Sequence, residues 1–505
     1  MAHTFRRLAI SGLLVCLSPL GCSDAPSNAP PSSASSDSSG SSDNEAAAGL
    51  EPVTVDDIQL STGALLSAYD ETAAELEVSS LRIEQALTIR VKGTSGGSVL
   101  VDGVVVPMNG AYSLTLDRLA DDRIIHIVHK NAAGTVVDQS LRTLPTDFPA
   151  FTVTADNPTP GWIFFTPGTW SALPLTPYIA ILDELGRVRY YRRMIATSTD
   201  FKWTVLPNGR TRYTYWSDES TESGAGTTVV LDENFDEIER IQLLATDKHA
   251  AYPTDAHDVL LLDDNHYVLT ATVSRTVNNV PEDLAGDDAT PTVGAAIIQE
   301  IEDGKVIFEW DSTEHPELYA SSSEGNAYAT STSTSAADYI HFNSIDIEPT
   351  TGNFIVSLRH QDALLELDRT TGATVWTLGG VNDQFGLDDA QRFSHQHHAR
   401  VQSDGSILFF DNDNAREATR IIQAKVDSPD LALTSFDAWD TGRYSMAMGS
   451  VQKLDATTYF IGWGAHTDDL SDISEIDRST GKTKFSLTFR DDYYSYRALK
   501  WTNHP

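Results

Sequence analysis

Two short sequence phrases alternate along residues 148–505, and this repetition limits the fold more than any other feature of the chain. The first phrase is an acidic residue, a turn and a strand-like segment, as in LDELGRVRYYRRM and IDRSTGKTKFSL. The second is a pair of strand-like segments around a turn, as in WTVLPNGRTRYTYW and HARVQSDGSILFFDN. The alternation indicates six units of roughly sixty residues, almost without helical periodicity. Such antiparallel units cannot bury their faces alone, so the pattern predicts an all-β chain with a six-bladed β-propeller, seven blades being the alternative.

A different β pattern precedes the repeats. Residues 50–147 contain short alternating segments such as GSVLVDGVVVPM, separated by Gly and Asn turns, and they predict a small β-sandwich. This part carries no cluster of chemically active residues, so we expect a structural domain. Residues 23–49 are rich in Ser, Pro and Ala and have almost nothing to bury, which predicts a disordered tether.

The first 22 residues have a basic start and a short apolar run, which predicts a secretory signal peptide. Cys22 follows SPLG, and this segment resembles a bacterial lipoprotein signal, in which the cysteine is acylated. We therefore expect the protein in the periplasm or on the outer cell surface, lipid-anchored at Cys22; ordinary signal-peptidase cleavage is the alternative. The only cysteines are Cys16 and Cys22, so the mature chain forms no internal disulfide.

The charge of the chain argues against two classes of partner. It has 72 acidic and 35 basic residues and a formal net charge of -37. Such a surface repels nucleic acid and anionic lipid. We expect no nucleic-acid partner, and contact with a membrane only through the lipid anchor.

Three successive units place a histidine just before an apolar strand. His257 lies in TDAHDV, His341 in YIHFNS together with Asn343, and His397 in SHQHHA. Arg359 closes the segment NFIVSLR. The innermost strands of a propeller line one channel, so residues at their ends converge although they are far apart in the sequence. The common phase of the histidines predicts a site there; histidines bonded to blade turns are the structural alternative.

The residue types suggest two chemistries. Three histidines can bind zinc, but no carboxylate occurs in matching phase at all three strands, and Arg359 would repel a cation. An arginine can instead bond two oxygens of a sulfate or phosphate, and Asn343 can donate to a third. A neutral histidine can attack such a group while another protonates the leaving oxygen. We therefore predict an oxyanion-transfer site without a metal, a metal site being the alternative.

The same phrases resemble the bacterial aryl-sulfate sulfotransferases, the family that needs no nucleotide sulfate donor. The similarity rests on DAHDV, on HFNSIDIEPTTGNFIVSLRHQDALLELDRTTGATVWTLGG and on QHHARVQSDGSILFFDNDNAR, and it covers most of residues 140–505. The resemblance implies a β-sandwich followed by a six-bladed propeller. It also implies ping-pong transfer of a sulfuryl group from an aryl sulfate to a phenolic acceptor through a sulfo-histidine, with no cofactor. A homodimer is compatible with it.

The resemblance also assigns roles to residues. It makes His397, which follows Gln396, the nucleophile, and it gives His257, His341 and Arg359 catalytic roles. Asn343 and Gln396 are implied to bind the substrate. The chain departs from the family in two ways: it lacks a disulfide near the site, and its nucleophile phrase is doubled, as HQHH. Strand alternation sets His398 on the opposite face from His397, which favours His397.

Two other functions remain alternatives. One is a non-catalytic, surface-anchored propeller that binds a glycan or a protein, because propellers serve many functions. The other is a sulfate or phosphate ester hydrolase that uses the same pocket. The segments at residues 278–292 and 319–338 look like insertions, and we expect them at the channel mouth.

Overall fold

The computed structural model divides the chain into two compact units, residues 1–146 and 147–505. It describes short segments between Thr54 and Pro145, and then residues 147–169, 176–218, 226–490 and 493–502. The predicted signal peptide, Cys22 and the tether lie outside the described residues. Among the helices of the described part, none has both the length and the apolar character needed to cross a membrane.

The first unit contains ten described strands in two sheets. One sheet has the order β1 (Thr54–Val55), β2 (Ile58–Leu60), β5 (Leu87–Val91) and β8 (Ala111–Leu114). The other has the order β3 (Ala64–Leu65), β4 (Glu75–Ser79), β10 (Val136–Thr143), β9 (Arg123–Lys130), β6 (Ser98–Val101) and β7 (Val104–Val106). The all-β character agrees with the prediction. The packing of these sheets as a sandwich over residues 50–147 stays a prediction.

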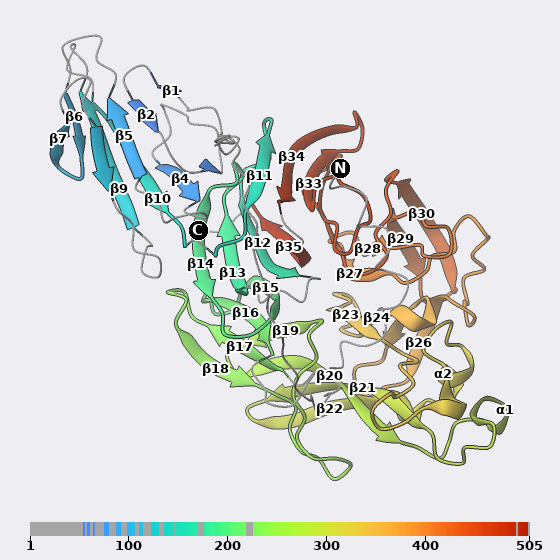
Figure 1. Cartoon of the computed structure of the whole chain (residues 1–505). Coiled ribbons are helices and arrows are strands. Elements are labelled where there is room, and N and C mark those ends of the chain that lie inside the picture. Colours follow the sequence, from blue (N-terminus) through green and yellow to red (C-terminus); the bar gives the residue numbers. More distant parts are fainter. Residues whose placement is uncertain are drawn as a thin grey trace, which may run out of the picture. The chain divides into compact units, whose positions relative to one another are not determined.

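The second unit is a β-propeller of six antiparallel sheets, which confirms the predicted blade count (Figure 1). In each blade the strands follow one another from the innermost strand outward. The first three blades are β35 (Tyr493–Trp501), β12 (Trp162–Thr169), β13 (Tyr178–Leu182) and β14 (Val188–Arg193); then β15 (Ser198–Val205), β16 (Thr211–Ser217), β17 (Thr227–Leu231) and β18 (Glu237–Ile241); then β19 (Val259–Asp263), β20 (His266–Thr276), β21 (Thr292–Glu302) and β22 (Lys305–Asp311).

The other three blades continue around the ring. They are β23 (Phe342–Ile347), β24 (Phe354–Leu358), β25 (Ala363–Leu367) and β26 (Thr374–Gly379); then β27 (His397–Val401), β28 (Ile407–Asp411), β29 (Arg420–Asp427) and β30 (Ala432–Asp440); then β31 (Ser450–Lys453), β32 (Thr458–Gly462), β33 (Ile473–Asp477), β34 (Lys482–Phe489) and β11 (Phe151–Ala155). Between strands lie the short helices α1 (Glu282–Ala285), η1 (Ser312–Glu314), α2 (Glu317–Ala320), η2 (Tyr328–Thr330) and η3 (Arg359–Gln361).

The two sequence phrases correspond to the two halves of a blade. The acidic phrase forms the third and fourth strands, for example β25 and β26, and the other phrase forms the first and second, for example β27 and β28. The first blade has no second phrase because its innermost strand, β35, comes from the C-terminal end of the chain. Large apolar side chains such as Trp376 and Phe409 fill the space between neighbouring blades.

Two strand pairings close the ring. β35 pairs with β12, with Trp501 opposite Trp162, and β11 adds an outer strand to the last blade by pairing with β34. A buried ion pair reinforces this closure: the Lys500 Nζ atom is 2.6 Å from the Glu475 Oε2 atom, and both side chains are fully buried. The N- and C-terminal ends of the propeller sequence are therefore held together by backbone pairing, and the ion pair joins the last blade to the first.

Replacing Lys500 with Met should destabilise the protein strongly. The variant removes the cation and leaves the Glu475 carboxylate buried, a change that typically costs about 3–5 kcal/mol. Lys484, whose Nζ atom is 3.3 Å from Glu475 Oε1, should keep the loss near the lower end of that range. Urea unfolding of the two proteins measures the difference.

Lys482→Met is the matched control. Its Nζ atom is 2.8 Å from Asp156 Oδ2, but these side chains are 52% and 63% exposed. An exposed pair contributes about 1 kcal/mol or less. Equal losses in the two variants would contradict the assigned role of the buried pair.

Candidate active site

The three predicted histidines and Arg359 lie at one end of the propeller channel. His257 and His341 precede the innermost strands β19 and β23, and His397 begins β27. Arg359 follows β24, which runs antiparallel to β23 and so returns to the same end. The Arg359 backbone N–H donates to the His341 carbonyl at 3.0 Å. The structure therefore brings these four residues together from three blades.

The side chains are close enough to influence one another. The ring centroids of His257 and His341 are 5.2 Å apart. Burial lowers the pKa of His397 well below its usual range, and the charge of Arg359, followed by His341 and His257, lowers it further. The His397 side chain is only 2% exposed. A buried imidazole of this kind is neutral at neutral pH, as a nucleophile must be.

The tautomer of His397 is set by its neighbours. Its Nδ1 atom lies 2.7 Å from Asn412 Oδ1 and 2.9 Å from the His395 carbonyl oxygen. Both are acceptors, so Nδ1 carries the proton and Nε2 carries the lone pair. The Met448 backbone N–H donates to Nε2 at 3.3 Å, a long contact that an incoming group can replace. The reactive nitrogen of His397 is therefore Nε2.

His257 and His341 have carboxylates where His397 has an amide. The Nδ1 atom of His257 contacts Asp255, and that of His341 lies 2.7 Å from Asp338 Oδ2. A carboxylate on Nδ1 stabilises the imidazolium form, and a neutral amide does so much less. Burial raises the pKa of Asp338, but His341, His360 and Arg359 together lower it more, and the net shift is downward. Burial lowers the pKa of His341 in spite of Asp338, so a proton on this ring is readily given up. The site thus contains two histidines with a carboxylate on Nδ1 and one with an amide there.

Arg359 is held on one edge of its guanidinium and free on the other. Its Nη1 atom donates to Glu324 Oε2 at 3.1 Å and also contacts His360. Its buried Nη2 atom has no hydrogen-bond partner among the described residues. The side chain is 3% exposed. A buried guanidinium with a free nitrogen beside three histidines provides a place for an anionic group.

Asn343 follows His341 by two residues, Gln396 directly precedes His397, and both are fully buried. The Asn343 side-chain nitrogen donates to the Gln396 carbonyl at 2.6 Å. The Gln396 side-chain nitrogen lies 2.9 Å from the Ala363 carbonyl and 3.0 Å from Ser357 Oγ. These contacts support the segment that carries His397. Direct contact of Asn343 and Gln396 with a substrate stays a prediction.

The backbone conformation keeps the histidine side chains of the doubled phrase, HQHH, apart. His395 and His398 have positive φ angles of 57° and 53°, and the pairing of β27 with β28 shifts register between His397 and Arg400. The His398 Nδ1 atom lies 3.1 Å from the Val451 carbonyl, away from the partners of His397. The bulge, and not simple alternation, separates the neighbouring rings.

Five residues of this site were not predicted from the sequence: Asp255, Asp338, Asn412, Glu324 and His360. Asp338 could have been found, because DAHD and DYIH each contain an aspartate two or three positions before the histidine. Asn412 lies in the turn DNDNAR after β28, and its side-chain nitrogen donates to the Ser445 carbonyl at 2.8 Å. That link depends on the next blade, so no local pattern reveals it.

Within the described part of the chain, one group of side chains could hold a metal ion. Ligand atoms of Asp338, His341 and His360 lie within 4.8 Å of one another. Burial lowers the pKa of His360 to about 3, so its ring is neutral. The His360 ring also contacts the Arg359 guanidinium, which would lie beside any bound cation and repel it. The donor set alone permits a metal, whereas the arginine favours an anion.

A buried ion cluster includes Asp258, the residue that follows His257. The Asp258 carboxylate is 2.6 Å from Lys202 Nζ and 2.7 Å from Arg400 Nη2. Asp200 is 2.8 Å from Arg497 Nη1 and also pairs with Lys202. These side chains come from β15, β27, β35 and the residue directly before β19, and they link four of the innermost strands. Removal of one partner from such a cluster would leave an uncompensated charge buried.

Asn412→Asp should move the pH profile of any reaction that uses His397. The new carboxylate would lie beside Nδ1 and stabilise the imidazolium, so the pKa of His397 should rise. Protonated His397 cannot attack, so the acid limb of kcat/KM should shift upward by about one pH unit or more. The measurement is kcat/KM for 4-nitrophenyl sulfate between pH 5 and 9.

Asn414→Asp is the control, because Asn414 lies in the same turn and its side-chain nitrogen bonds the Met446 carbonyl. This variant should keep the wild-type pH profile. Equal shifts in both variants would mean that a general charge effect, and not the Nδ1 contact, controls His397.

One family of known proteins matches most of the propeller sequence. The model of the family described as Arylsulfotransferase (ASST) matches residues 156–497. No curated protein matches the chain.

Several solved structures are similar at low identity. A protein of unknown function from Bacteroides caccae is 12% identical, with 68% of this chain and 98% of that chain covered and a TM-score of 0.40. A putative 6-phosphogluconolactonase from Bacteroides uniformis is 11% identical, with 75% and 95% covered and a TM-score of 0.34. AztD from Citrobacter koseri is 10% identical, with 68% and 99% covered and a TM-score of 0.28. Similarity at these TM-scores carries no argument about function.

Proposed function

The chain belongs to the arylsulfotransferase family, and on this basis we propose that it transfers a sulfuryl group from an aryl sulfate to a phenol through a sulfo-histidine at His397. The observation that carries the proposal is the different partner of each histidine. His397 has a neutral acceptor on Nδ1, whereas His257 and His341 have carboxylates. This division matches one nucleophile and two proton carriers.

In the first half-reaction, the Nε2 lone pair of His397 attacks sulfur. The N–S bond forms as the bond from sulfur to the aryl oxygen breaks, and the electron pair leaves with that oxygen. His257 or His341, in its imidazolium form, gives the leaving oxygen a proton. Asp255 and Asp338 stabilise the charged form that this step requires.

In the second half-reaction, a phenol takes the place of the first product. The neutral histidine accepts its proton, and the phenolic oxygen attacks sulfur as the N–S bond breaks. His397 is thereby regenerated with its lone pair on Nε2. Sulfuryl transfer resembles phosphoryl transfer in having a loose transition state, so positioning and charge neutralisation supply most of the catalysis.

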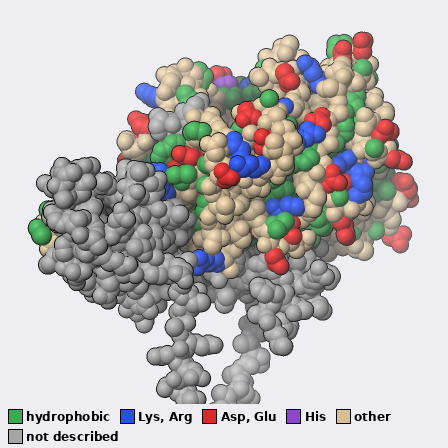
Figure 2. Space-filling view, turned by 90° about the horizontal axis from the view of Figure 1, so that it is seen from above, with side chains coloured by type: hydrophobic (Ala, Val, Ile, Leu, Met, Phe, Trp, Pro, Cys, Tyr) green, Lys and Arg blue, Asp and Glu red, His purple; other side chains and the backbone are tan. Residues whose placement is uncertain are grey.

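Arg359 supplies charge for the sulfuryl oxygens. Its free Nη2 atom can donate to one oxygen, and its fixed Nη1 edge keeps the guanidinium in place. The net charge of -37 affects the approach of an anion more than its binding. At moderate ionic strength, salt screens exposed charges that lie more than about 10 Å from the site. Acidic and basic side chains are interspersed on the face shown in Figure 2.

The direct test is incubation of the purified protein with 4-nitrophenyl sulfate, with and without phenol. We expect nitrophenolate release at a steady rate only when phenol is present, together with phenyl sulfate as product. Steady release of inorganic sulfate without phenol would identify a hydrolase instead. Absence of nitrophenolate in both reactions would favour the alternative of a non-catalytic propeller that binds a glycan or a protein.

The physiological setting is part of the proposal. An aryl sulfate donor and a phenolic acceptor are the proposed partners, with no cofactor. A lipid anchor at Cys22 would hold the propeller in the periplasm or at the outer cell surface. Labelling of cells with a radioactive fatty acid, followed by comparison with Cys22→Ser, measures this anchoring.

A further inference from the structure

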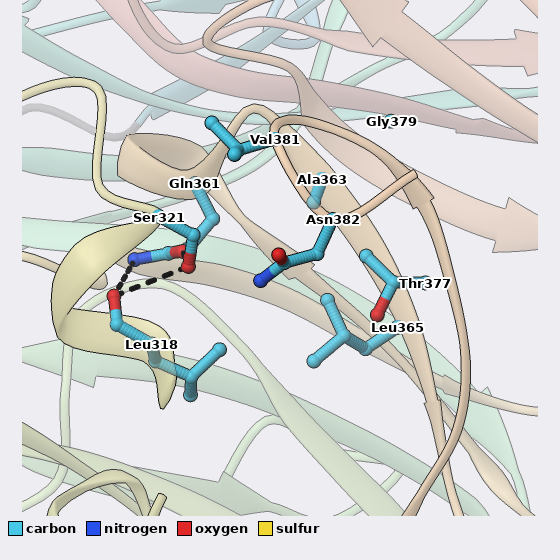
Figure 3. Close-up of a pocket in the computed structure, with 9 residues that line it drawn as sticks. All are labelled: Leu318, Ser321, Gln361, Ala363, Leu365, Thr377, Gly379, Val381 and Asn382. Atoms are coloured by element: carbon cyan, nitrogen blue, oxygen red, sulfur yellow. Dashed lines mark hydrogen bonds between the residues drawn. The ribbon is translucent and has the colours of Figure 1, made fainter. Parts of the chain in front are cut away.

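An insertion between β22 and β23 reaches the active site. Residues 312–341 include η1, α2 and η2, and they are anchored to the segment after β24. The Ser321 hydroxyl donates to Gln361 Oε1 at 2.5 Å, and the Gln361 side-chain nitrogen donates to the Leu318 carbonyl at 3.0 Å (Figure 3). The side chains that line the pocket in Figure 3 include no ionisable group, so the pocket itself provides no catalytic chemistry.

The turn after Ser321 is held rigidly over the arginine segment. The Ser323 backbone N–H donates to the His360 carbonyl at 2.7 Å. Gly325 has a φ angle of +71°, and a Cβ atom there would lie 2.1 Å from the Asp338 carbonyl oxygen. Only glycine fits this close approach. The backbone on both sides of Glu324 is therefore fixed.

The Glu324 carboxylate joins two parts of the site. Its Oε2 atom accepts from Arg359 Nη1 at 3.1 Å and lies 2.6 Å from His395 Nε2. The hydrogen bond from His395 is the main cause that lowers the pKa of Glu324 to about 2, so the group is ionised at neutral pH. One oxygen atom thus contacts both the arginine and the segment that carries the nucleophile.

His395 connects Glu324 to His397. The His395 backbone N–H donates to Asp362 Oδ1 at 2.8 Å, and its carbonyl accepts from His397 Nδ1 at 2.9 Å. The positive φ angle of His395 places it in a conformation that a non-glycine residue adopts only when its surroundings hold it there. Glu324 and Asp362 provide that support from two sides.

We propose that Glu324 is a positioning residue that fixes Arg359 and, through His395, the imidazole of His397. This role rests on the proposed function. Glu324 does not touch the reacting atoms; it keeps the arginine edge and the His397 tautomer in place. Its negative charge also opposes the binding of an anionic donor. Glu324 therefore supports kcat through its position and raises KM through its charge.

Two substitutions separate those effects. In Glu324→Gln the amide oxygen, placed where Oε2 lies now, can still accept from both Arg359 and His395, so the geometry survives without the charge. In Glu324→Ala both contacts are lost. We expect kcat to stay within about threefold of wild type for Gln and to fall about 100-fold for Ala, because misplacement by about 1 Å costs that much. The KM for 4-nitrophenyl sulfate should fall in the Gln variant.

A second readout does not require turnover. Nitrogen-15 NMR of labelled histidines reports the tautomer of His397, which should stay Nδ1–H in the Gln variant and become mixed in the Ala variant. Glu317→Ala is the control on the same insertion, because the Glu317 side chain is 59% exposed and contacts only His315 among the described residues in an ion pair. That control should match the wild type in both measurements.

The outcomes separate the role of Glu324 from the proposed function. Wild-type kcat together with an unchanged His397 spectrum in Glu324→Ala would overturn the positioning role and leave sulfuryl transfer intact. A rise in kcat in the Ala variant would overturn it too and would identify Glu324 as an inhibitory carboxylate. A wild-type protein without transfer activity would refute the proposed function, while the NMR comparison would still decide the role of Glu324.

Discussion

His397→Ala should abolish transfer of the sulfuryl group from 4-nitrophenyl sulfate to phenol. The variant removes the only nitrogen in the proposed mechanism that bonds to sulfur, and the neighbouring histidines have their Nδ1 atoms engaged by carboxylates. We expect kcat to fall by at least about 10³-fold, as is usual when a nucleophile is removed. Steady-state release of nitrophenolate measures the loss.

A second measurement locates the covalent intermediate. After incubation with donor alone, the wild-type protein should gain the mass of one sulfuryl group, and His397→Ala should not. His398→Asn is the control for the doubled phrase, since an asparagine can still bond the backbone of Val451, which His398 contacts. A sulfo-enzyme in His397→Ala, or its loss only in His398→Asn, would place the nucleophile elsewhere.

Arg359→Lys should be severely impaired although the positive charge is kept. The guanidinium uses its Nη1 atom to hold Glu324 and leaves Nη2 for the substrate. A lysine has a single charged nitrogen and cannot serve both partners with fixed geometry. Loss of one preorganised donor to a transition-state oxygen costs about 10²–10³-fold, so we expect a fall of that size in kcat/KM.

Arg369→Lys is the matched substitution outside the site. Arg369 pairs with Glu300 at the blade edge, where the arginine side chain is 26% exposed. This variant should retain kcat/KM within about twofold, since weakening a partly exposed pair has a small effect. Wild-type kcat/KM in Arg359→Lys would show that simultaneous contact of residue 359 with Glu324 and the anion is not required.

The order of these effects follows from the chemistry. Nothing else in the proposed mechanism replaces the Nε2 lone pair of His397, whereas a lysine at position 359 still attracts an anion. Asn412→Asp and the Glu324 variants act through these two residues and should therefore have smaller effects. Double variants of Arg359 and Glu324 should be non-additive, because the two side chains are in contact.

The repeated phrases were sufficient to predict the propeller. Each phrase is a hairpin, and a hairpin is determined by local alternation and turn residues, as in β27 with β28. Ring closure could not be predicted this way. The pairing of β35 with β12 joins residues from opposite ends of the propeller sequence, and only the completed ring brings them together.

Six hairpin-built units, with His257, His341 and His397 in equivalent positions before apolar strands, could be predicted from the chain alone, because alternation and turn chemistry act over a few residues. What each histidine contacts depends on tertiary packing. Asn412 reaches His397 from the turn after β28, and Glu324 reaches Arg359 and His395 from an insertion in the preceding blade connection. The protonation and orientation of an imidazole depend on such contacts, which form when distant segments pack and leave no periodic pattern in the chain.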